Sequence, residues 1–576
     1  MDRASRKSRK NLLAEETGTI YKRWQGRIKI AIAYPNRYHV GMSNLGFQSV
    51  YRLLNSFDEV VCERVFLPEH TENTHASIRS LESSRPVADF DILAFSLSFE
   101  NDYPNLLTIL NLAGLPLRSK DRSPPLPLVI AGGVCCLLNP EPIAEFIDCF
   151  LIGEAEPLLP EFIEHFDPHQ DRRATLLKIA RHVPGTYVPA FYEATYHRDG
   201  ALADFKPTED VPERINRRIQ ADLSTGATGS AVLTPNTTFQ KSYLVEVTRG
   251  CPHGCRFCVA GYIYRPPRYR PLTQLKRCIK DGSALTSTIG LVGAAVSDHP
   301  DIEKLCQVRE KGHLRFSFSS LRADGLSPKL LSALKESGLK TAAIAPDAGS
   351  EKLQKVINKG ISETDILDAV ESLVAHGIAN LKLYFMVGLP TETMEDVISI
   401  VALVKRLKHR FLQSSRTRRR IGEITISLNC FVPKPFTPFQ WVAMQEIEML
   451  KTKIKSVRQG VKTMANIRLH SDLPRWAYIQ ALFSRGDRRV AQLLEAAHQN
   501  RGNWVKTLKT SALNSDFYVY RKRDIGELLP WDFIDHGIEK SYLVKEYEKA
   551  LRAETTSICR PGVCSSCGVC EKDTPE

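Results

Sequence analysis

The feature that most constrains the fold is an alternation of short apolar runs with helical stretches, which begins near Lys29 and continues through most of the chain. In the first part the apolar runs read "IKIAIAYP", "VVCERVFL", "FDILAFSLS", "LPLVIAGG" and "DCFLIGE". Strands that are apolar throughout and alternate with helices are typical of a parallel sheet that is covered on both faces. The pattern therefore predicts an α/β, doubly wound domain over residues 25–195.

The second part of the chain repeats the alternation with six further apolar runs. They read "YLVEVT", "TIGLVG", "RFSFSS", "TAAIAP", "LKLYFMVG" and "ITISLNCF", and a helical stretch follows most of them. Six βα units in series predict a partial (β/α)6 barrel over residues 236–445, with its reactive loops at the carboxyl ends of the strands.

The remaining segments set the domain boundaries that we expect. A chain of 576 residues is too long for one hydrophobic core, so several domains are expected. Besides the two α/β blocks, we expect a basic N-terminal tail (1–24), a linker (196–235), a mainly helical C-terminal region (446–558) and a cysteine-cluster tail (559–576).

Composition narrows the cellular setting. The chain is 43% hydrophobic and 25% charged, and it contains no run of about 20 apolar residues, so we expect no membrane span. The N-terminus lacks the apolar core of a secretory signal, which predicts a cytoplasmic protein. In a reducing compartment, clustered cysteines are expected to be metal ligands or catalytic thiols rather than disulfides.

The net charge of +13 is compatible with an acidic partner. The segment "RTRRR" (416–420) concentrates part of this charge, and nucleic acid is one partner that it would suit. No aromatic residues interleave the segment, so a solvated loop is the alternative.

Three cysteines, Cys251, Cys255 and Cys258, follow the first strand of the second block in the spacing Cys-x3-Cys-x2-Cys. Three thiolates on one short loop can ligate three irons of a 4Fe-4S cluster and leave the fourth iron open for another ligand. The alternative is a structural zinc site that adds His253 to the three cysteines.

The segment "CPHGCRFC", with Phe257 before the third cysteine, resembles the signature of the radical S-adenosylmethionine (radical SAM) superfamily. The resemblance extends to "VGAAVSDHP", "SFSSLRADGLSP", "APDAGSEKLQKVINKG", "MVGLPTET" and "NCFVPKPFTPFQW". These segments are similar to a branch of uncharacterised proteins that have an N-terminal cobalamin (B12)-binding-like domain and a C-terminal CGVC cysteine cluster.

The resemblance implies an enzyme that cleaves SAM reductively at the 4Fe-4S cluster. The products would be methionine and a 5′-deoxyadenosyl radical, which abstracts hydrogen from an unknown substrate. It also implies a reductant such as flavodoxin or ferredoxin, and cobalamin-dependent methyl transfer as one outcome. The alternative is an iron-sulfur binding or redox-sensing protein with nucleic-acid affinity.

The resemblance places SAM contacts at four residues, Ser319, Arg322, Asp347 and Gly388. The alternative is that Ser319 and Arg322 only cap and brace a loop and that Gly388 is only a turn residue. An Arg can pair with the methionyl carboxylate of SAM, which is the role expected of Arg322. Asp347 stands where the branch usually has Glu. The sequence Gly293-Ala294-Ala295 replaces the Gly-Gly-Glu that many members have at the second strand end.

The N-terminal domain is expected to bind its ligand beyond the carboxyl ends of its strands, as doubly wound sheets do. The loop of residues 34–46 contains His39 and Gly41, our candidate residues for a cobalamin-like site. The pattern Asp-x-His-x-x-Gly, which supplies a lower axial ligand, is absent. Cobalamin without a histidine ligand and a vestigial or substrate-binding domain both remain open.

The tail carries four cysteines in "CRPGVCSSCGVC", which are Cys559, Cys564, Cys567 and Cys570. Their spacing is similar to that of ferredoxin-type clusters and predicts an auxiliary 4Fe-4S cluster. Zinc is the alternative, because Cys-x2-Cys also occurs in zinc sites.

Overall fold

The computed structural model of the protein describes residues 3–69, 77–226, 228–308, 314–416, 421–564 and 566–572. The chain divides into two compact units. The first comprises Met1–Ser242, Leu482–Tyr518 and Gly526–His536, and the second comprises Tyr243–Ala481, Val519–Ile525 and Gly537–Glu576. The C-terminal region that we expect over 446–558 is therefore shared between the two units.

The core of the first unit is a six-stranded sheet in the order β2-β1-β3-β4-β5-β6. Its strands are β1 (Ile28–Arg37), β2 (Val60–Leu67), β3 (Ile92–Ser96), β4 (Leu128–Gly132), β5 (Cys149–Leu151) and β6 (Thr186–Tyr187). Neighbouring strands are parallel except β5 and β6, which are antiparallel. From β1 the chain continues to β2 on one side, and from β3 it continues to β4 and β5 on the other. The carboxyl ends of β1 and β3 are therefore the topological switch point, where such sheets bind ligands.

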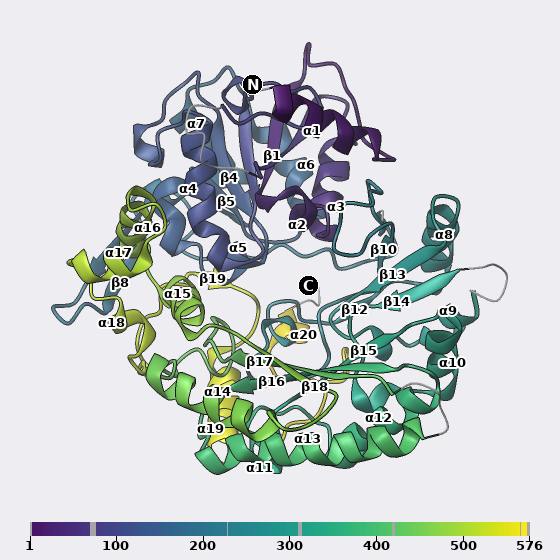
Figure 1. The fold of residues 1–576 in the computed structure, drawn as a ribbon. Coiled ribbons are helices and arrows are strands. Elements are labelled where there is room, and N and C mark those ends of the chain that lie inside the picture. Colours follow the sequence, from purple (N-terminus) through teal and green to yellow (C-terminus); the bar gives the residue numbers. More distant parts are fainter. Residues whose placement is uncertain are drawn as a thin grey trace. The chain divides into compact units, whose positions relative to one another are not determined.

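Helices accompany this sheet along its length (Figure 1). They are α1 (Arg3–Ala14), α2 (Tyr38–Gly41), α3 (Leu45–Leu54), α4 (Tyr103–Leu112), α5 (Val134–Leu138), α6 (Ala155–His165) and α7 (Arg172–His182). Strand β1 is buried without alternation from Ile30 to Pro35, as expected for a strand covered on both faces. The doubly wound domain predicted from the apolar runs is confirmed.

Segments from elsewhere in the chain complete the first unit. They comprise a hairpin of β7 (Tyr192–Tyr196) and β8 (Leu202–Pro207), the parallel pair of β9 (Ile215–Asn216) and β19 (Ile534–Asp535), and the helices α16 (Ala491–Gln499) and α17 (Trp504–Thr510). Helix α16 packs on α4, and the ring of Phe483 lies 5.4 Å from that of Tyr103. Residues beyond 480 thus cover part of the N-terminal sheet.

The second unit contains all six predicted strands, in two parallel sheets. The first has the order β10-β13-β14, and the second has the order β15-β16-β17-β18. The strands are β10 (Tyr243–Glu246), β13 (Thr288–Val292), β14 (Arg315–Phe318), β15 (Thr341–Asp347), β16 (Asn380–Val387), β17 (Ile424–Cys430) and β18 (Ile467–Ser471). Among the described residues, β14 pairs with β13 alone, so the strands of the expected barrel do not form one continuous sheet. Strand β18 is an additional edge strand that lies in the region expected to be mainly helical.

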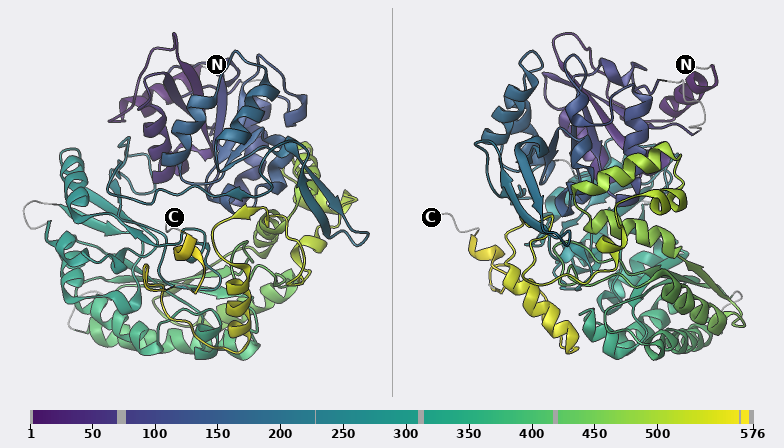
Figure 2. Two further views of the ribbon diagram at one scale, coloured as in Figure 1. Left: turned by 180° about the vertical axis from the view of Figure 1, so that it is seen from behind. Right: turned by 90° about the vertical axis from the view of Figure 1, so that its left-hand side faces the viewer.

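The helices of the second unit are α8 (Leu272–Ser283), α9 (Ile302–Gln307), α10 (Pro328–Glu336), α11 (Glu351–Val356), α12 (Glu363–Ala375), α13 (Met394–Ser415), α14 (Ile447–Val461), α19 (Lys540–Leu551) and α20 (Val569–Lys572). The helices α15 (Pro474–Arg485) and α18 (Asp516–Val519) each cross a boundary between the two units. Capping boxes begin α12 at Ser362 and α13 at Thr393, which explains their sharp starts. Helix α13 packs between α12 and α14 (Figure 1). Figure 2 shows the C-terminal segment in yellow, with α19 followed by the short α20.

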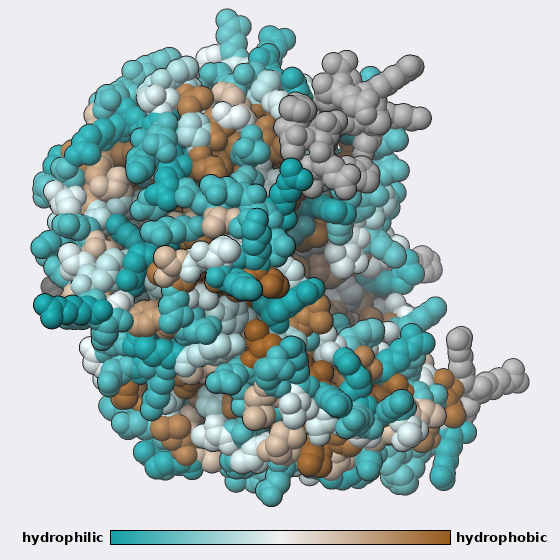
Figure 3. Space-filling view, turned by 60° about the vertical axis from the view of Figure 1, so that its left-hand side comes forward, coloured by the Kyte–Doolittle hydropathy of each residue, from teal (hydrophilic) through white to brown (hydrophobic). Residues whose placement is uncertain are grey.

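The surface offers few further indications of a partner. None of the described helices is long and apolar enough to cross a membrane. On the face in Figure 3, hydrophobic side chains are scattered among hydrophilic ones rather than gathered in one patch. Of the basic segment 416–420, residues 417–420 lie outside the described residues, so its predicted affinity for nucleic acid stays a prediction.

Candidate functional site

Cys251, Cys255 and Cys258 lie on a loop that a two-stranded ladder closes. After β10 the chain forms β11 (Thr248–Arg249), which pairs antiparallel with β12 (Arg268–Tyr269) at the base of the loop. Gly250 sits between the ladder and the first cysteine with φ of +77°, and a Cβ there would lie 2.5 Å from the Tyr264 carbonyl oxygen. Only glycine fits this turn. The ladder and the turn therefore place all three thiols just beyond the carboxyl end of β10.

The three thiols lie close enough together to influence one another. Burial, and to a lesser extent the neighbouring Cys255 and Cys258 thiols, raise the pKa of Cys251 to about 12. Burial likewise raises the pKa of Cys255 to about 11, while Lys359 and Arg322 act to lower it. Nearby cations favour the thiolate form, which is the form that ligates metals.

The donor set fits an iron-sulfur cluster. Within the described residues, no group of three or more His, Cys, Asp and Glu side chains is arranged to hold a metal ion. A 4Fe-4S cluster differs from a single ion, because its thiolates ligate separate irons rather than meeting at one point. Three grouped thiols beside two cationic side chains are a suitable set of ligands for such a cluster.

His253, the residue considered as a zinc ligand, is tied to the end of a neighbouring strand. Its Nε2 atom lies 2.5 Å from Oδ2 of Asp298, in the loop that follows β13. Both side chains are largely buried. The sequence did not point to Asp298, whose carboxylate anchors the cysteine loop to the next strand end.

Asp347, a predicted SAM contact, forms a buried ion pair that the sequence did not reveal. It ends β15 with φ of +63°, an uncommon conformation for a residue with a side chain. The Lys359 ammonium lies 2.5 Å from its Oδ2 atom. Burial raises the pKa of the Asp347 carboxyl, and Lys359 opposes that effect. Lys359 also lies within electrostatic reach of Cys255 and Cys258, so this pair belongs to the surroundings of the cysteine loop.

Ser319 and Arg322, two other predicted SAM contacts, are engaged by neighbouring strand-end loops. The Ser319 hydroxyl lies 3.2 Å from the Gly293 nitrogen and 3.1 Å from its carbonyl oxygen. The Arg322 guanidinium donates to both carboxylate oxygens of Asp324, at 3.0 and 2.9 Å, and reaches the Lys359 carbonyl. Their contact with SAM stays a prediction.

Gly388, the fourth predicted contact, begins a loop that a buried ion pair supports. Its backbone N–H donates to Oε2 of Glu392 at 2.7 Å, and Lys453 of α14 lies 2.6 Å from the same oxygen. Glu392 and Lys453 are both almost fully buried. The Oε1 atoms of Glu392 and Gln445 are buried and have no hydrogen-bond partner among the described residues. Lys453 and Gln445 lie about 60 residues beyond Gly388, and no sequence motif links them to it.

In the first unit, amide side chains join the loops at the topological switch point. Asn36, at the end of β1, donates to Oδ1 of Asp102 at 2.8 Å, and Asn44 donates to the Ser98 hydroxyl at 3.1 Å. Burial raises the pKa of Asp102 to about 6. These side chains form a polar cluster where the strand order reverses. Asn36 and Asn44 lie in the predicted loop of residues 34–46, whereas the sequence did not point to Ser98 or Asp102.

The two candidate residues in the same loop lie differently. His39 is exposed on α2, whereas Gly41 is buried, and a Cβ at Gly41 would lie 2.5 Å from Cε1 of Phe66. Gly41 therefore allows α2 to pack closely on the end of β2. A ligand contact for either residue stays a prediction.

The four tail cysteines form a second group. Burial raises the pKa of the Cys559 thiol, Arg265 opposes this effect, and the Cys567, Cys564 and Cys570 thiols add to it. Hydrogen bonding to Ser566 lowers the pKa of Cys564. Residue 565 lies outside the described residues. The four thiols are thus electrostatic neighbours, as ligands of one metal centre must be.

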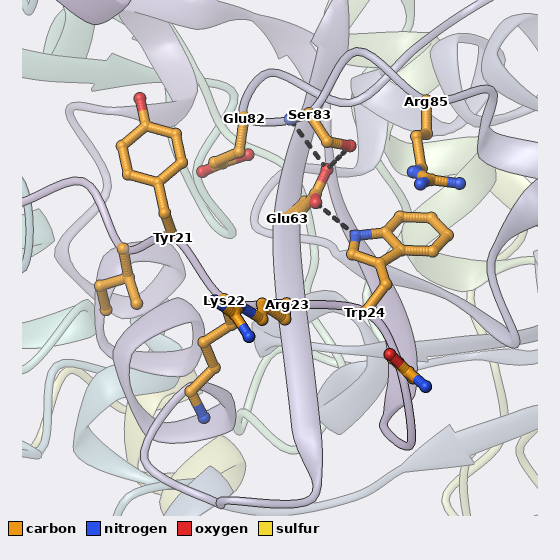
Figure 4. A pocket seen from close by; sticks show the side chains of 10 residues that line it. Tyr21, Lys22, Arg23, Trp24, Glu63, Glu82, Ser83 and Arg85 are labelled. Carbon is orange, nitrogen blue, oxygen red and sulfur yellow. Dashed lines mark hydrogen bonds between the residues drawn. The ribbon is translucent and has the colours of Figure 1, made fainter.

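A pocket of about 430 Å³ lies in the first unit, away from the strand-end loops (Figure 4). Trp24 forms one wall, and its indole N–H donates to Glu63 at 2.7 Å while the Arg85 guanidinium lies 4.3 Å from the ring centre. Glu63 lies in the middle of β2, the edge strand of the sheet, so the pocket lies beside that edge, and none of its lining residues belongs to the loop of residues 34–46. It is therefore a separate feature from the predicted ligand site.

Two families match the chain. The family described as "Radical SAM proteins, N-terminal" matches residues 46–189, and the one described as "Radical SAM superfamily" matches residues 245–404. Together they cover more than half of the chain. The second match spans the cysteine loop and the strand ends at Ser319, Asp347 and Gly388.

Several known proteins are similar to the chain. Uncharacterized protein MJ0966 of Methanocaldococcus jannaschii is 29% identical over 503 residues, which are 86% of this chain and 97% of that protein. A tRNA-2-methylthio-N(6)-dimethylallyladenosine synthase of Chloroherpeton thalassium is 21% identical over 183 residues, 30% of this chain and 40% of that protein. A structure of the radical S-adenosylmethionine methyltransferase TsrM from Kitasatospora setae, with cobalamin and a [4Fe-4S] cluster bound, is 12% identical, covers 84% of this chain and 100% of its own, and has a TM-score of 0.48.

The cysteine loop, its position after the first strand of a parallel α/β unit and the two family matches agree with one another. The resemblance found in "CPHGCRFC" and the strand-end segments is therefore confirmed. The chain belongs to the radical SAM superfamily and carries the N-terminal domain of radical SAM proteins ahead of the radical SAM domain.

Proposed function

We propose that the protein is a radical SAM enzyme in which Cys251, Cys255 and Cys258 hold a 4Fe-4S cluster and the strand-end loops of the second unit bind SAM. The observation that carries the proposal is the grouping of the three thiols with the Asp347–Lys359 pair at the strand ends of the domain that the superfamily matches. When bound, the cluster supplies one electron for the reductive cleavage of SAM to methionine and a 5′-deoxyadenosyl radical. The substrate that gives up hydrogen is unknown.

The residues around the loop would bind and orient SAM. The Arg322 guanidinium donates two hydrogen bonds to the Asp324 carboxylate. When SAM binds, the methionyl carboxylate would replace the Asp324 carboxylate, since both can accept two parallel hydrogen bonds. Ser319 keeps the Gly293 loop in place beside it. Asp347 and Lys359 would hold the polar end of SAM beside the thiols.

The loop at Gly388 would receive the adenine ring. A Cβ at Gly388 would lie 3.6 Å from the Gln445 Oε1 atom, so this buried acceptor faces the loop. Buried acceptors without partners are costly, and an amino group that donates to them removes the cost. The exocyclic amine of adenine is a donor of this kind, and Glu392 and Gln445 would accept from it.

The polar cluster at the switch point of the first unit supports a ligand there, and cobalamin is our candidate for it. Amide groups such as those of Asn36 and Asn44 can exchange hydrogen bonds with the amide substituents of a corrin ring. Because the pattern Asp-x-His-x-x-Gly is absent around His39, we expect no histidine below the cobalt, and a His39→Ala variant should retain the same cobalamin absorption spectrum. A bound cobalamin would favour methyl transfer as the reaction. If the protein retains no cobalamin after gel filtration, methyl transfer from cobalamin is ruled out.

SAM binding tests the proposal directly. SAM added to the anaerobic, reduced protein should change the electron paramagnetic resonance (EPR) spectrum of the cluster, because one iron is open to it. An Arg322→Met variant should bind SAM at least tenfold more weakly, since a hydrogen bond to a charged group contributes about 1.5–3 kcal/mol.

Arg315→Met is the matched control, because Arg315 is exposed at the start of the same strand-loop segment, and its affinity for SAM should not change. If Arg322→Met also binds normally, the assignment of Arg322 is wrong. A spectrum that SAM leaves unchanged would instead favour the alternative of an iron-sulfur binding or redox-sensing protein.

A further inference from the structure

The tail cysteines lie against the backbone of the first cysteine loop. The Cys559 N–H donates to the carbonyl of Pro252, the residue after Cys251, at 2.8 Å. Asn358 connects the same two segments: its amide group donates to the carbonyls of Gly254 and Thr556, both at 3.2 Å, and its Oδ1 accepts from the Thr556 N–H at 2.9 Å. One buried side chain thus holds the tail to the loop.

Arg256, inside the Cys-x3-Cys-x2-Cys motif, holds the helix that leads into the tail. Its side chain has no exposed surface, and its guanidinium pairs with Glu546 of α19 at 3.1 Å. The same group donates to the Glu554 carbonyl at 2.9 Å and to the Val356 carbonyl at 3.0 Å. A motif residue between two cluster cysteines is therefore committed to binding the C-terminal segment.

Arg265, at the far end of the cysteine loop, lies beside the tail thiols. Its guanidinium carbon lies 5.2 Å from the ring centre of Tyr262 and 5.1 Å from that of Tyr542 on α19. The Glu539 N–H, before α19, donates to the Cys567 carbonyl at 3.0 Å. Arg265 is buried, so it joins the far end of the cysteine loop to α19, the helix that leads into the tail.

The two groups of cysteines are adjacent but distinct. Cys251, Cys255 and Cys258 lie within eight consecutive residues, and the four tail cysteines lie within twelve. Tyr269 on β12 lies within electrostatic reach of both Cys251 and Cys559. The structure thus presents two sets of donors that are joined through the backbone and through three buried side chains.

We propose that Cys559, Cys564, Cys567 and Cys570 hold a second 4Fe-4S cluster, and that Asn358, Arg256 and Arg265 fasten it to the first cysteine loop as one two-centre site. Four cysteines complete the coordination of a cubane, so this centre has no open iron for SAM and differs from the first in kind. The two-centre site depends on the proposed function, because that function places the first cluster at Cys251, Cys255 and Cys258. The second cluster does not depend on it, because the tail supplies all four of its thiols.

Metal content separates the two centres. The full chain is reconstituted anaerobically as wild type, as the loop variant Cys251→Ala/Cys255→Ala/Cys258→Ala and as the tail variant Cys559→Ala/Cys564→Ala/Cys567→Ala/Cys570→Ala. We expect about eight irons per wild-type chain and about four in each variant, by addition of two four-iron clusters. SAM should alter the EPR spectrum of the tail variant and leave that of the loop variant unchanged.

Two outcomes overturn the tail centre. One is stoichiometric zinc with about four irons in the wild type, and the other is an iron content that the tail variant does not lower. If the loop variant holds about four irons, as expected, but SAM has no effect on the EPR spectrum of the wild type, the proposed function is wrong and the tail centre stands.

The Asn358→Gly variant tests whether Asn358 holds the tail to the first cysteine loop. Asn358 has φ of +49°, so glycine keeps the backbone and removes only the three hydrogen bonds. We expect amide hydrogen exchange over residues 553–562 to become at least tenfold faster. Asn466→Gly is the matched control, because Asn466 has φ of +60° in an exposed turn of the same unit, and it should leave exchange there unchanged. Equal exchange in the two variants would show that Asn358 does not fasten the tail.

Discussion

The carboxyl ends of the parallel strands carry different chemistry in the two units. In the second unit they bring together three thiols and the buried ion pairs Asp347–Lys359 and Glu392–Lys453. In the first unit the corresponding loops are joined by neutral amides and a hydroxyl, and the acid among them, Asp102, has a pKa raised to about 6 by burial. The same sheet geometry thus supports a charged site in one unit and a weakly charged one in the other.

This difference indicates what each sheet can bind. Buried ion pairs beside thiols suit a charged ligand such as SAM and a cluster held by thiolates, because each charge there has a partner. Neutral amides suit a large ligand that is itself rich in amide groups. Substitutions in each unit should therefore have different effects, the largest of them at the charged site.

The largest effect is expected from breaking a buried pair in the second unit. In Lys453→Met, Glu392 loses its cation while it stays buried, so the free energy of unfolding should fall by about 3–5 kcal/mol. Lys451→Met, which removes an exposed lysine of the same helix, should change it by about 0.5 kcal/mol or less. Denaturant unfolding of both variants measures the difference, and equal stability would mean that the pair does not support the Gly388 loop.

A smaller, pH-dependent effect is expected in the first unit. The pKa of Asp102 is raised in the folded state, so its contribution to stability is fully present below about pH 4 and is lost as the pH rises through about 6. Asp102→Asn should remove this dependence and raise the free energy of unfolding at pH 7 by about 2–3 kcal/mol, at 1.36 kcal/mol for each pKa unit.

Unfolding curves at pH 4.5 and pH 7 provide the measurement for Asp102→Asn. A variant that is less stable than the wild type at both pH values would show that the carboxylate forms interactions that an amide cannot replace. The switch point would then be a charged site, like that of the second unit.

The smallest effect concerns the packing under the candidate cobalamin loop. Gly41→Ala places a methyl group against Phe66 and should lower the free energy of unfolding by about 1–2 kcal/mol. Gly526→Ala is the control, because a Cβ there meets nothing within 4 Å, and its thermal midpoint should match that of the wild type. If Gly41→Ala is equally stable, the loop adjusts easily, and a ligand role for Gly41 becomes the better explanation for the glycine.

The sequence predicted what is local in the chain. The apolar runs indicated six of the seven strands in the parallel sheets of the second unit and the five parallel strands of the first, and the spacing of Cys251, Cys255 and Cys258 identified the cysteine loop. These features depend on residues a few positions apart, so periodicity and spacing reveal them.

Contacts between distant segments could not be predicted in this way. Lys453 reaches Glu392 from a helix 61 residues later. Asn358 contacts Gly254, 104 residues before it, and Thr556, 198 residues after it. An isolated Lys or Asn in a helix or turn is unremarkable by itself, so no local pattern marks it. The separation of β14 from β15 and the return of residues 482–518 to the first unit were missed for the same reason, because strand pairing and packing depend on the whole chain.

The central claim is that the three-cysteine loop performs reductive cleavage of SAM, and one measurement tests it most directly. Wild-type protein and the Cys251→Ala/Cys255→Ala/Cys258→Ala variant are reconstituted anaerobically, reduced and incubated with SAM, and 5′-deoxyadenosine is quantified by mass spectrometry. We expect 5′-deoxyadenosine from the wild type and none above background from the variant, with the variant still soluble and folded. Formation of 5′-deoxyadenosine at an undiminished rate in the variant, or its absence from a wild type that carries its full complement of iron, would contradict the account.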